Sequence, residues 1–178
     1  TDVIQPGKVL ILYGPRRVGK TSLIRKYLES RQGKIFSTTG EDLPTQEIFR
    51  AQNINQFKLA FADYDFLFID EAQLLPNAGL GLKMIVDHLP DLKIIASGSS
   101  SFDLSTKVGE PLTGRHRILT LYPLAMLELK QQWGGMAIHQ KLDEFLIYGC
   151  FPETLKQTNQ NDKIEYLTTL RDSYLLKD

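Results

Sequence analysis

The residues best suited to chemistry lie in one glycine-rich octapeptide near the start of the chain. This segment, Gly14-Pro-Arg-Arg-Val-Gly-Lys-Thr21, has the spacing G-x-x-x-x-G-K-[ST]. Glycines at the fixed positions let successive backbone N–H groups turn toward an anion. The lysine ammonium that follows can neutralise β- and γ-phosphates, and the threonine hydroxyl can ligate Mg²⁺. The octapeptide therefore predicts a loop that binds the phosphates of a nucleotide.

We expect this loop and the first residue after it to contact the nucleotide. The predicted contacts are Gly14, Pro15, Arg16, Arg17, Val18, Gly19, Lys20, Thr21 and Ser22. Within this set Lys20 binds the phosphates and Thr21 binds the metal ion. No N-K-x-D motif occurs in the chain, so selectivity for guanine is not indicated.

A second group of chemical residues ends an apolar run, Phe66-Leu-Phe-Ile-Asp70-Glu71. Such a run predicts a strand that is buried on both faces, and ligands gather at the carboxyl ends of parallel strands. There Asp70 can hold Mg²⁺, and Glu71 can polarise a water molecule for attack on a γ-phosphate. A small-molecule kinase has no need of such a glutamate, so Glu71 favours hydrolysis over transfer to a small molecule.

The elements that must position these residues follow from short apolar runs that alternate with helical patterns. We expect strands at 8–13, 34–38, 66–70, 93–97 and 117–121, with helical stretches at 20–30, 45–62 and 80–89. From Pro123 onward the pattern is helical, at 124–133, 136–148 and 163–176. The expected fold class is α/β, a three-layer sandwich with a parallel five-stranded sheet. Residues 1–122 would form the core domain and residues 123–178 a small C-terminal helical lid.

Composition limits the other classes of function. The 178 residues carry 21 Lys plus Arg and 21 Asp plus Glu, so net charge does not indicate binding to nucleic acid or to an anionic membrane. A local basic patch that binds nucleic acid remains an alternative, because six basic residues lie close together in the sequence: Arg16, Arg17, Lys20, Arg25, Lys26 and Arg31. The favoured interpretation is that some of them bind the nucleotide phosphates and the others lie on a solvated helix face. The apolar runs are too short to span a bilayer.

Cysteine and histidine usage adds two expectations. Cys150 is the only cysteine, so the chain has no internal disulfide and is expected to be cytoplasmic. The histidines at 88, 116 and 139 have no metal-ligand spacing, so no zinc site is expected. The chain opens without Met and closes on a helical pattern without a stop signal, and we expect it to be a fragment of something longer.

Together the octapeptide and the stretch from Phe66 to Gln73 resemble the AAA+ branch of the P-loop ATPases. Three further stretches, 93–101, 112–124 and 148–153, resemble more narrowly the AAA domain of predicted bacterial and archaeal ATPases with a DUF4143-type C-terminal domain. The final residues, 174–178, resemble the segment just before that second domain, which is absent here. The resemblance implies the P-loop NTPase fold, with the lid truncated at its end, and ATP as the nucleotide.

The resemblance also implies further site residues. In this family a polar residue at the end of the fourth strand helps to position the attacking water; Ser97, Ser99 and Ser100 lie there, and Ser99 aligns best. Arg115 would reach a phosphate, in its own subunit or in a neighbouring one, and Arg117 is its competitor. Arg171 could act as a lid arginine, but a surface charge is the favoured interpretation.

The sequence thus predicts an ATP-binding protein and Mg²⁺-dependent ATPase of the AAA+ type that acts on an unknown partner. Glu71, Ser99 and Arg115 would be catalytic, and Thr21 and Asp70 would hold Mg²⁺. The alternatives are a nucleotide-gated switch with negligible turnover and a DNA-associated ATPase. A homo-oligomer or a protein partner could form through the lid and the missing C-terminal domain, and no membrane partner is expected.

Overall fold

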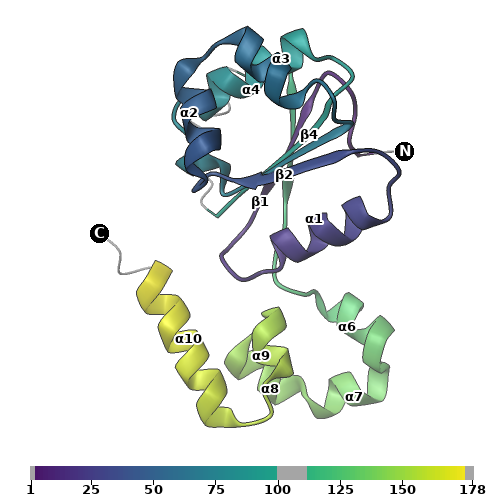
Figure 1. The fold of residues 1–178 in the computed structure, drawn as a ribbon. Helices are drawn as coiled ribbons and strands as arrows, with labels where there is room; N and C mark the ends of the chain where they lie inside the picture. The colour runs from purple at the N-terminus through teal and green to yellow at the C-terminus, as the bar shows by residue number, and fades with distance from the viewer. Residues whose placement is uncertain (1–2, 100–111, 175–178) are drawn as a thin grey trace. The chain divides into compact units, whose positions relative to one another are not determined.

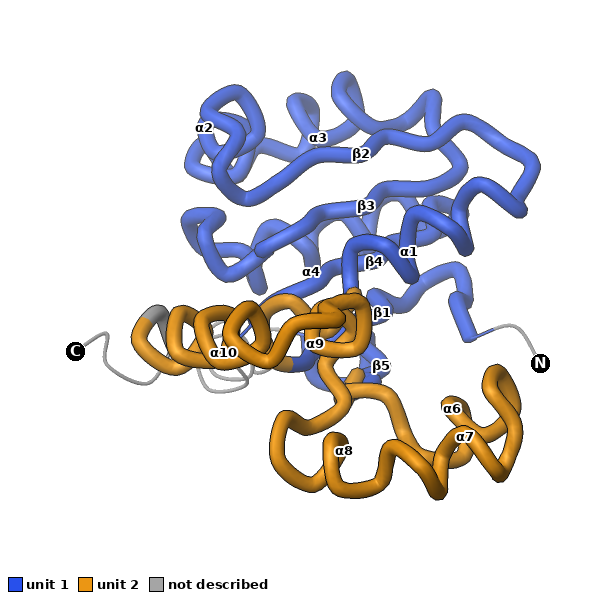
Figure 2. The backbone as a smooth tube through the Cα atoms, turned by 90° about the horizontal axis from the view of Figure 1, so that it is seen from below, with its two compact units in different colours: residues 1–14, 20–120 blue, residues 15–19, 121–178 orange. Residues whose placement is uncertain are grey.

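The computed structural model describes residues 3–99 and 112–174. Ser100, one of the alternatives for the polar residue after the fourth strand, and positions 175–178 of the terminal stretch lie outside the described residues. The chain divides into two compact units, residues 1–14 with 20–120, and residues 15–19 with 121–178 (Figure 2).

Unit 1 is built on a parallel sheet. Within the described residues its five strands are β1 (Val9–Tyr13), β2 (Ile35–Thr39), β3 (Phe66–Asp70), β4 (Lys93–Gly98) and β5 (His116–Thr120). Their order across the sheet is β2-β3-β4-β1-β5, and neighbouring strands are parallel. Because the strands are parallel, the residues that follow β1, β3 and β4 meet at one edge of the sheet.

The apolar runs explain why the central strands form. β1 is buried along its whole length, and β3 and β4 are buried at nearly every position, as expected for strands covered on both faces. The register aligns Ile11 with Ala96, and Ala96 with Ile69, so one face of the sheet presents a continuous apolar surface. Burial of this surface is the main stabilising term of the unit.

Helices cover both faces of the sheet. α1 (Lys20–Glu29) packs on one face through Ile24 and Leu28. α2 (Leu43–Ala51), α3 (Ile54–Phe61) and α4 (Ala78–His88) lie on the other side of the strands (Figure 1). Their buried residues join the main core, which includes Phe49, Phe57, Phe61, Leu82 and Ile85. The α/β class and the three layers are therefore confirmed.

The helical stretch expected near 45–62 consists of two helices. The chain turns between α2 and α3 at Gln52, which adopts a left-handed conformation with φ of 47°. Asn53 then caps α3, because its side-chain oxygen accepts from the backbone N–H groups of Asn55 and Gln56. The left-handed Gln52 therefore ends α2, and the cap at Asn53 starts α3 at the next residue.

Unit 2 contains the loop residues 15–19 and the C-terminal helices. These helices are α6 (Met126–Trp133), α7 (Gly135–Gln140), α8 (Leu142–Tyr148), α9 (Pro152–Lys156) and α10 (Gln160–Tyr174). The pattern at 136–148 is divided at Lys141 into α7 and α8, and the short α9 was not expected. Leu129, Phe145 and Tyr166 are buried, and the ring of Trp133 stacks on Phe145 with centroids 6.2 Å apart. None of the described helices in either unit is both long and apolar enough to cross a membrane.

The packing of α4 on α2 gives the first prediction. A Cβ at Gly81 would lie 2.5 Å from Cδ1 and 2.7 Å from Cε1 of the fully buried ring of Phe49. Alanine in place of a helical glycine ordinarily stabilises by about 0.5–1 kcal/mol, but overpacking costs about 1–3 kcal/mol. We expect Gly81→Ala to lower the free energy of unfolding by about 1–2 kcal/mol, measured by urea denaturation.

Gly135→Ala is the matched control for that prediction. The same Cβ added at the start of α7 meets nothing closer than 3.7 Å, the end of the Lys130 side chain. Its free energy of unfolding should be unchanged or slightly raised. If Gly81→Ala behaved like Gly135→Ala, the close packing of α4 on Phe49 would be wrong.

Candidate functional site

The glycine-rich loop joins the end of β1 to the start of α1. Gly14 has φ of 153° and Gly19 has φ of 99°, backbone conformations that glycine adopts without strain. Lys20 is the first residue of α1, and its Nζ donates to the carbonyl oxygen of Gly14 at 2.8 Å. The ammonium is buried and held against the first residue of the loop. Among the other predicted contacts Val18 is buried, while Arg16, Arg17 and Ser22 are exposed.

One residue of this loop contacts the C-terminal helices within unit 2. The guanidinium carbon of Arg17 lies over the ring of Tyr166 in α10, 5.4 Å from its centroid, which is a cation–π distance. Arg17 has a left-handed backbone with φ of 61°, which is unusual for a residue other than glycine. Burial raises the pKa of Tyr166, and the charge of Arg17 opposes that shift. No motif in the sequence indicates this pairing.

Asp70, the last residue of β3, connects three elements at the carboxyl edge of the sheet. Its Oδ2 accepts a hydrogen bond of 2.7 Å from the hydroxyl of Thr21 in α1. Its Oδ1 accepts from the hydroxyl of Ser97 in β4 and from the backbone N–H of Glu71. Thr21 and Asp70, the residues predicted to hold Mg²⁺, are thus in direct contact. The hydroxyl of Ser97 is thus bound to the carboxylate of Asp70.

Glu71 lies in a sharp turn that begins the 3₁₀ helix η1 (Ala72–Leu74). Its backbone is left-handed, with φ of 48° and ψ of 46°. Gly40 approaches this turn closely: its N–H donates to the carbonyl of Asp70 at 2.7 Å, and a Cβ on Gly40 would lie 2.3 Å from the carbonyl oxygen of Glu71. Only glycine fits there, so Gly40 is a requirement of the site that the motifs did not reveal.

A glutamine joins two of the predicted catalytic residues. The side-chain Nε2 of Gln73 donates to Oε2 of Glu71 and lies 3.4 Å from the hydroxyl oxygen of Ser99. Ser99, which follows β4, is buried. Gln73 lies in the stretch from Phe66 to Gln73 that carries the resemblance, but the sequence analysis gave it no role. Its position two residues after Glu71 is the only feature of the sequence that could have indicated this contact.

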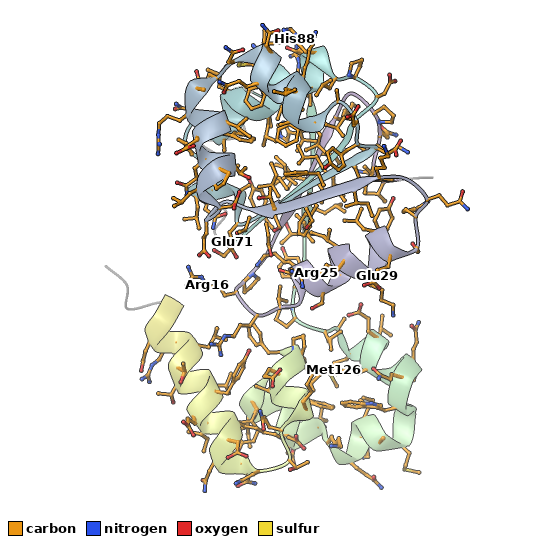
Figure 3. All side chains as sticks on the ribbon, viewed as in Figure 1. Arg16, Arg25, Glu29, Glu71, His88 and Met126 are labelled. Carbon is orange, nitrogen blue, oxygen red and sulfur yellow. The ribbon has the colours of Figure 1, made fainter. Side chains whose placement is uncertain are left out.

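Arg115 lies away from these residues. It immediately precedes β5, and its carbonyl accepts from the N–H of Val9, at the amino ends of β5 and β1. Its Nε is paired with Asp87 at 2.6 Å, and both side chains are partly exposed. In Figure 3 His88, the neighbour of Asp87 in the chain, lies at the opposite end of unit 1 from Glu71.

This position corrects part of the expectation for Arg115. A strand of five residues spans about 16 Å, and Arg115 is at the edge of the sheet opposite to Gly14 and Asp70. It therefore does not reach the phosphate site of its own subunit. A role in a neighbouring subunit stays a prediction, and the partly exposed pair with Asp87 is equally that of a surface charge. Arg117 is the second residue of β5 and so lies near the same end of the strand. Arg171 is exposed and paired with the adjacent Asp172 at 2.7 Å, as a surface charge would be.

The oxygen atoms around Asp70 suit Mg²⁺. The donors are one hydroxyl and one carboxylate, and Mg²⁺ commonly takes one or two protein oxygens together with phosphate oxygens. In residues 3–99 and 112–174 no three His, Cys, Asp or Glu side chains gather to hold a metal by themselves. A cavity of about 330 Å³, lined in part by Arg25, Ser37 and Asp70, gives the carboxylate free space. The described residues fit an ion that arrives with a nucleotide.

Two further groups near the site have shifted pKa values. Burial raises the pKa of Tyr13, the last residue of β1, to about 12, so this phenol is neutral at physiological pH. Hydrogen bonds from the side chain and backbone of Thr45 lower the pKa of Asp42, which caps α2.

The fold and the loop define a class. A parallel sheet of order β2-β3-β4-β1-β5, with the glycine-rich loop after β1 and the acidic pair at the end of β3, is that of an AAA+ P-loop ATPase domain. The family model described as "AAA domain" matches residues 6–130, well over half of the chain. The chain belongs to this family and is a nucleotide-binding, ATPase-type module. The narrower resemblance to ATPases with a DUF4143-type domain stays a prediction.

Solved structures are similar in fold. Domain III of the replication initiation protein DnaA from Thermotoga maritima is 16% identical, with a TM-score of 0.53, over 93% of this chain and 86% of that one. A chain from a study of katanin self-assembly is 21% identical, with a TM-score of 0.49, over 70% of this chain and 43% of that one. A mutant of RuvB from T. maritima is 26% identical, with a TM-score of 0.48, over 70% of this chain and 41% of that one.

Two facts qualify these comparisons. This chain spans about half the length of the katanin chain and of a DNA replication initiation factor, covering 43% and 56% of them. No curated protein matches the chain. The DnaA domain is only 16% identical to this chain, so that similarity shows the fold alone.

Proposed function

We propose that this domain binds ATP with Mg²⁺ and hydrolyses it. The observation that carries the proposal is the contact between Thr21 and Asp70, with Glu71 next in the chain. A lysine and a hydroxyl at the start of α1 and two carboxylates at the end of β3 are the groups that hydrolysis of a phosphoanhydride requires. The family assignment supports the same chemistry.

The proposed mechanism gives each residue one task. Lys20 binds the β- and γ-phosphates, and the backbone of residues 14–19 donates to their oxygens. Thr21 and Asp70 hold Mg²⁺, which when bound would neutralise phosphate charge. Glu71 accepts the proton of a water molecule as its oxygen attacks the γ-phosphorus, and ADP leaves. Ser99 helps to orient that water.

The proposal extends to organisation and partners. Residues 1–122 would act as the ATPase core and residues 123–178 as the helical lid, in the cytoplasm. A second copy of the chain or a protein partner would use the ATP cycle through the lid and a C-terminal domain outside this chain. If Arg115 acts on a nucleotide, its position at the far edge of the sheet requires that nucleotide to be bound by another copy of the chain.

A nucleotide-gated switch with negligible turnover is the second candidate. The observation in its favour is that Gln73 already engages the carboxylate of Glu71. A carboxylate held in this way could be either prepared for catalysis or restrained from it.

Glu71→Gln separates these two functions. In an ATPase, loss of the general base should reduce kcat by about 10²- to 10⁴-fold and leave ATP affinity unchanged. Steady-state phosphate release and equilibrium binding of a fluorescent ATP analogue measure the two effects. Lys20→Ala is the control, because loss of the ammonium should abolish binding itself. If the parent protein hydrolyses ATP no faster than Glu71→Gln, the nucleotide-gated switch is the correct function and the ATPase is not.

Asp70→Asn tests the metal site. The amide keeps the shape of the side chain but loses the charge that binds Mg²⁺, so affinity in EDTA should be retained and the Mg²⁺-dependent gain should disappear. Titrations with and without Mg²⁺ measure this. Asp42→Asn is the matched control, because asparagine caps a helix as well as aspartate does. Equal Mg²⁺ dependence in Asp70→Asn and the parent would remove Asp70 from the metal site.

Arg115→Ala tests the arginine that a neighbouring subunit would supply. Such an arginine raises turnover by about 10³-fold or more, because it stabilises charge on the γ-phosphate. Arg115→Ala should bind ATP normally and hydrolyse it poorly, and addition of Lys20→Ala protein should restore part of the activity. Arg171→Ala, which removes an exposed arginine with an adjacent partner, is the control. Turnover equal to the parent at every protein concentration would exclude Arg115 and make Arg117 the next candidate.

A further inference from the structure

Gln73 occupies the point where the two predicted water-handling residues meet. Glu71 comes from the turn after β3, and Ser99 from the segment after β4. These residues are far apart in the sequence, yet the Nε2 of Gln73 donates to Glu71 and reaches Ser99 at 3.4 Å. One carboxamide therefore fixes the distance between a proposed base and a proposed water-orienting hydroxyl.

The orientation of this carboxamide is determined by Glu71. An ionised carboxylate only accepts hydrogen bonds, so the end of the amide that faces it must be the nitrogen. This choice leaves Oε1 of Gln73 buried and without a hydrogen-bond partner among the described residues. A buried polar atom without a partner costs free energy, and such atoms in native structures call for an explanation. The charge-assisted bond to Glu71 offsets that cost.

Because the backbone of Glu71 is held in place, the contact with Gln73 determines where the carboxylate of Glu71 lies. The left-handed conformation is held by the close approach of Gly40 and by the bond from the N–H of Leu74 to the carbonyl of Glu71. With the backbone fixed, the carboxylate can move only through its own side-chain torsions. Gln73 restricts those torsions by binding one of the two carboxylate oxygens.

We propose that Gln73 is a positioning residue for ATP hydrolysis, which holds Glu71 and Ser99 in the arrangement that activates one water molecule. This inference rests on the proposed function and deepens it. Gln73 exchanges no proton: the water proton passes to Glu71, the new bond forms between the water oxygen and the γ-phosphorus, and the bond to the leaving ADP breaks. Gln73 acts through Glu71, because a misplacement of about 1 Å at a reacting group can cost about 10²-fold in rate.

The test is Gln73→Met, which retains the length and volume of the side chain but removes the donor. The parent, this variant, Glu71→Gln and the double variant are compared by phosphate release and by equilibrium ATP binding. We expect kcat of Gln73→Met to fall about tenfold or more, with ATP affinity within about twofold of the parent. In the Glu71→Gln background, single-turnover measurements should show no further loss. Gln56→Met, at an exposed position of α3, should retain parent activity.

Each outcome has one meaning. If the parent and Glu71→Gln have the same turnover, the proposed ATPase function fails and this inference fails with it. If Glu71→Gln is inactive but Gln73→Met is as active as the parent, only the inference fails, and Gln73 fills space. A rise in kcat of Gln73→Met would also overturn it, because Gln73 would then restrain Glu71. A further loss in the Glu71→Gln background would show that Gln73 acts independently of Glu71.

Discussion

The candidate site depends on the hydrogen bonds that the carboxylate of Asp70 accepts. This carboxylate accepts hydrogen bonds from Thr21 in α1, from Ser97 in β4 and from the backbone of Glu71, so it connects the loop helix, the acidic strand and the next strand. Hydrogen bonds to an ionised acceptor are roughly twice as strong as those between neutral groups. These bonds fix the start of α1, and therefore Lys20, relative to β3.

The direction of the strands determines which residues can cooperate in one subunit. The residues that immediately follow β1, β3 and β4 lie at the carboxyl edge, whereas a residue that precedes β5 lies at the amino edge. Arg115 is in the second group, and no rotation of its side chain spans the length of a strand. An arginine at this place in a parallel sheet therefore lies out of reach of the phosphate loop that follows β1 of the same molecule.

The sequence predicted what depends on regular patterns. The strands followed from continuous apolar runs, and the candidate phosphate loop from residue types at fixed spacing. It could not predict features that depend on tertiary contact. The approach of Gly40 to Glu71, the stacking of Arg17 on Tyr166 and the bond from Gln73 to Glu71 each join residues whose distance only the fold defines. The place of Arg115 at the amino end of β5 was implied by the expected parallel sheet, but the role came from the resemblance and not from strand direction.

The candidate site also contains conformations that local preference disfavours. Arg17 and Glu71 both have left-handed backbones, although neither is glycine, and Gln73 keeps a buried carbonyl oxygen without a partner among the described residues. Strained residues persist only where surrounding contacts overdetermine them, and they concentrate at functional sites. Around Glu71 these contacts are polar. The backbone N–H of Glu71 donates to the carboxylate of Asp70, and the N–H of Gly40 donates to the carbonyl of Asp70. The amide of Gln73 donates to the carboxylate of Glu71. These contacts offset the cost of the left-handed backbone at Glu71 and limit the positions that its carboxylate can take.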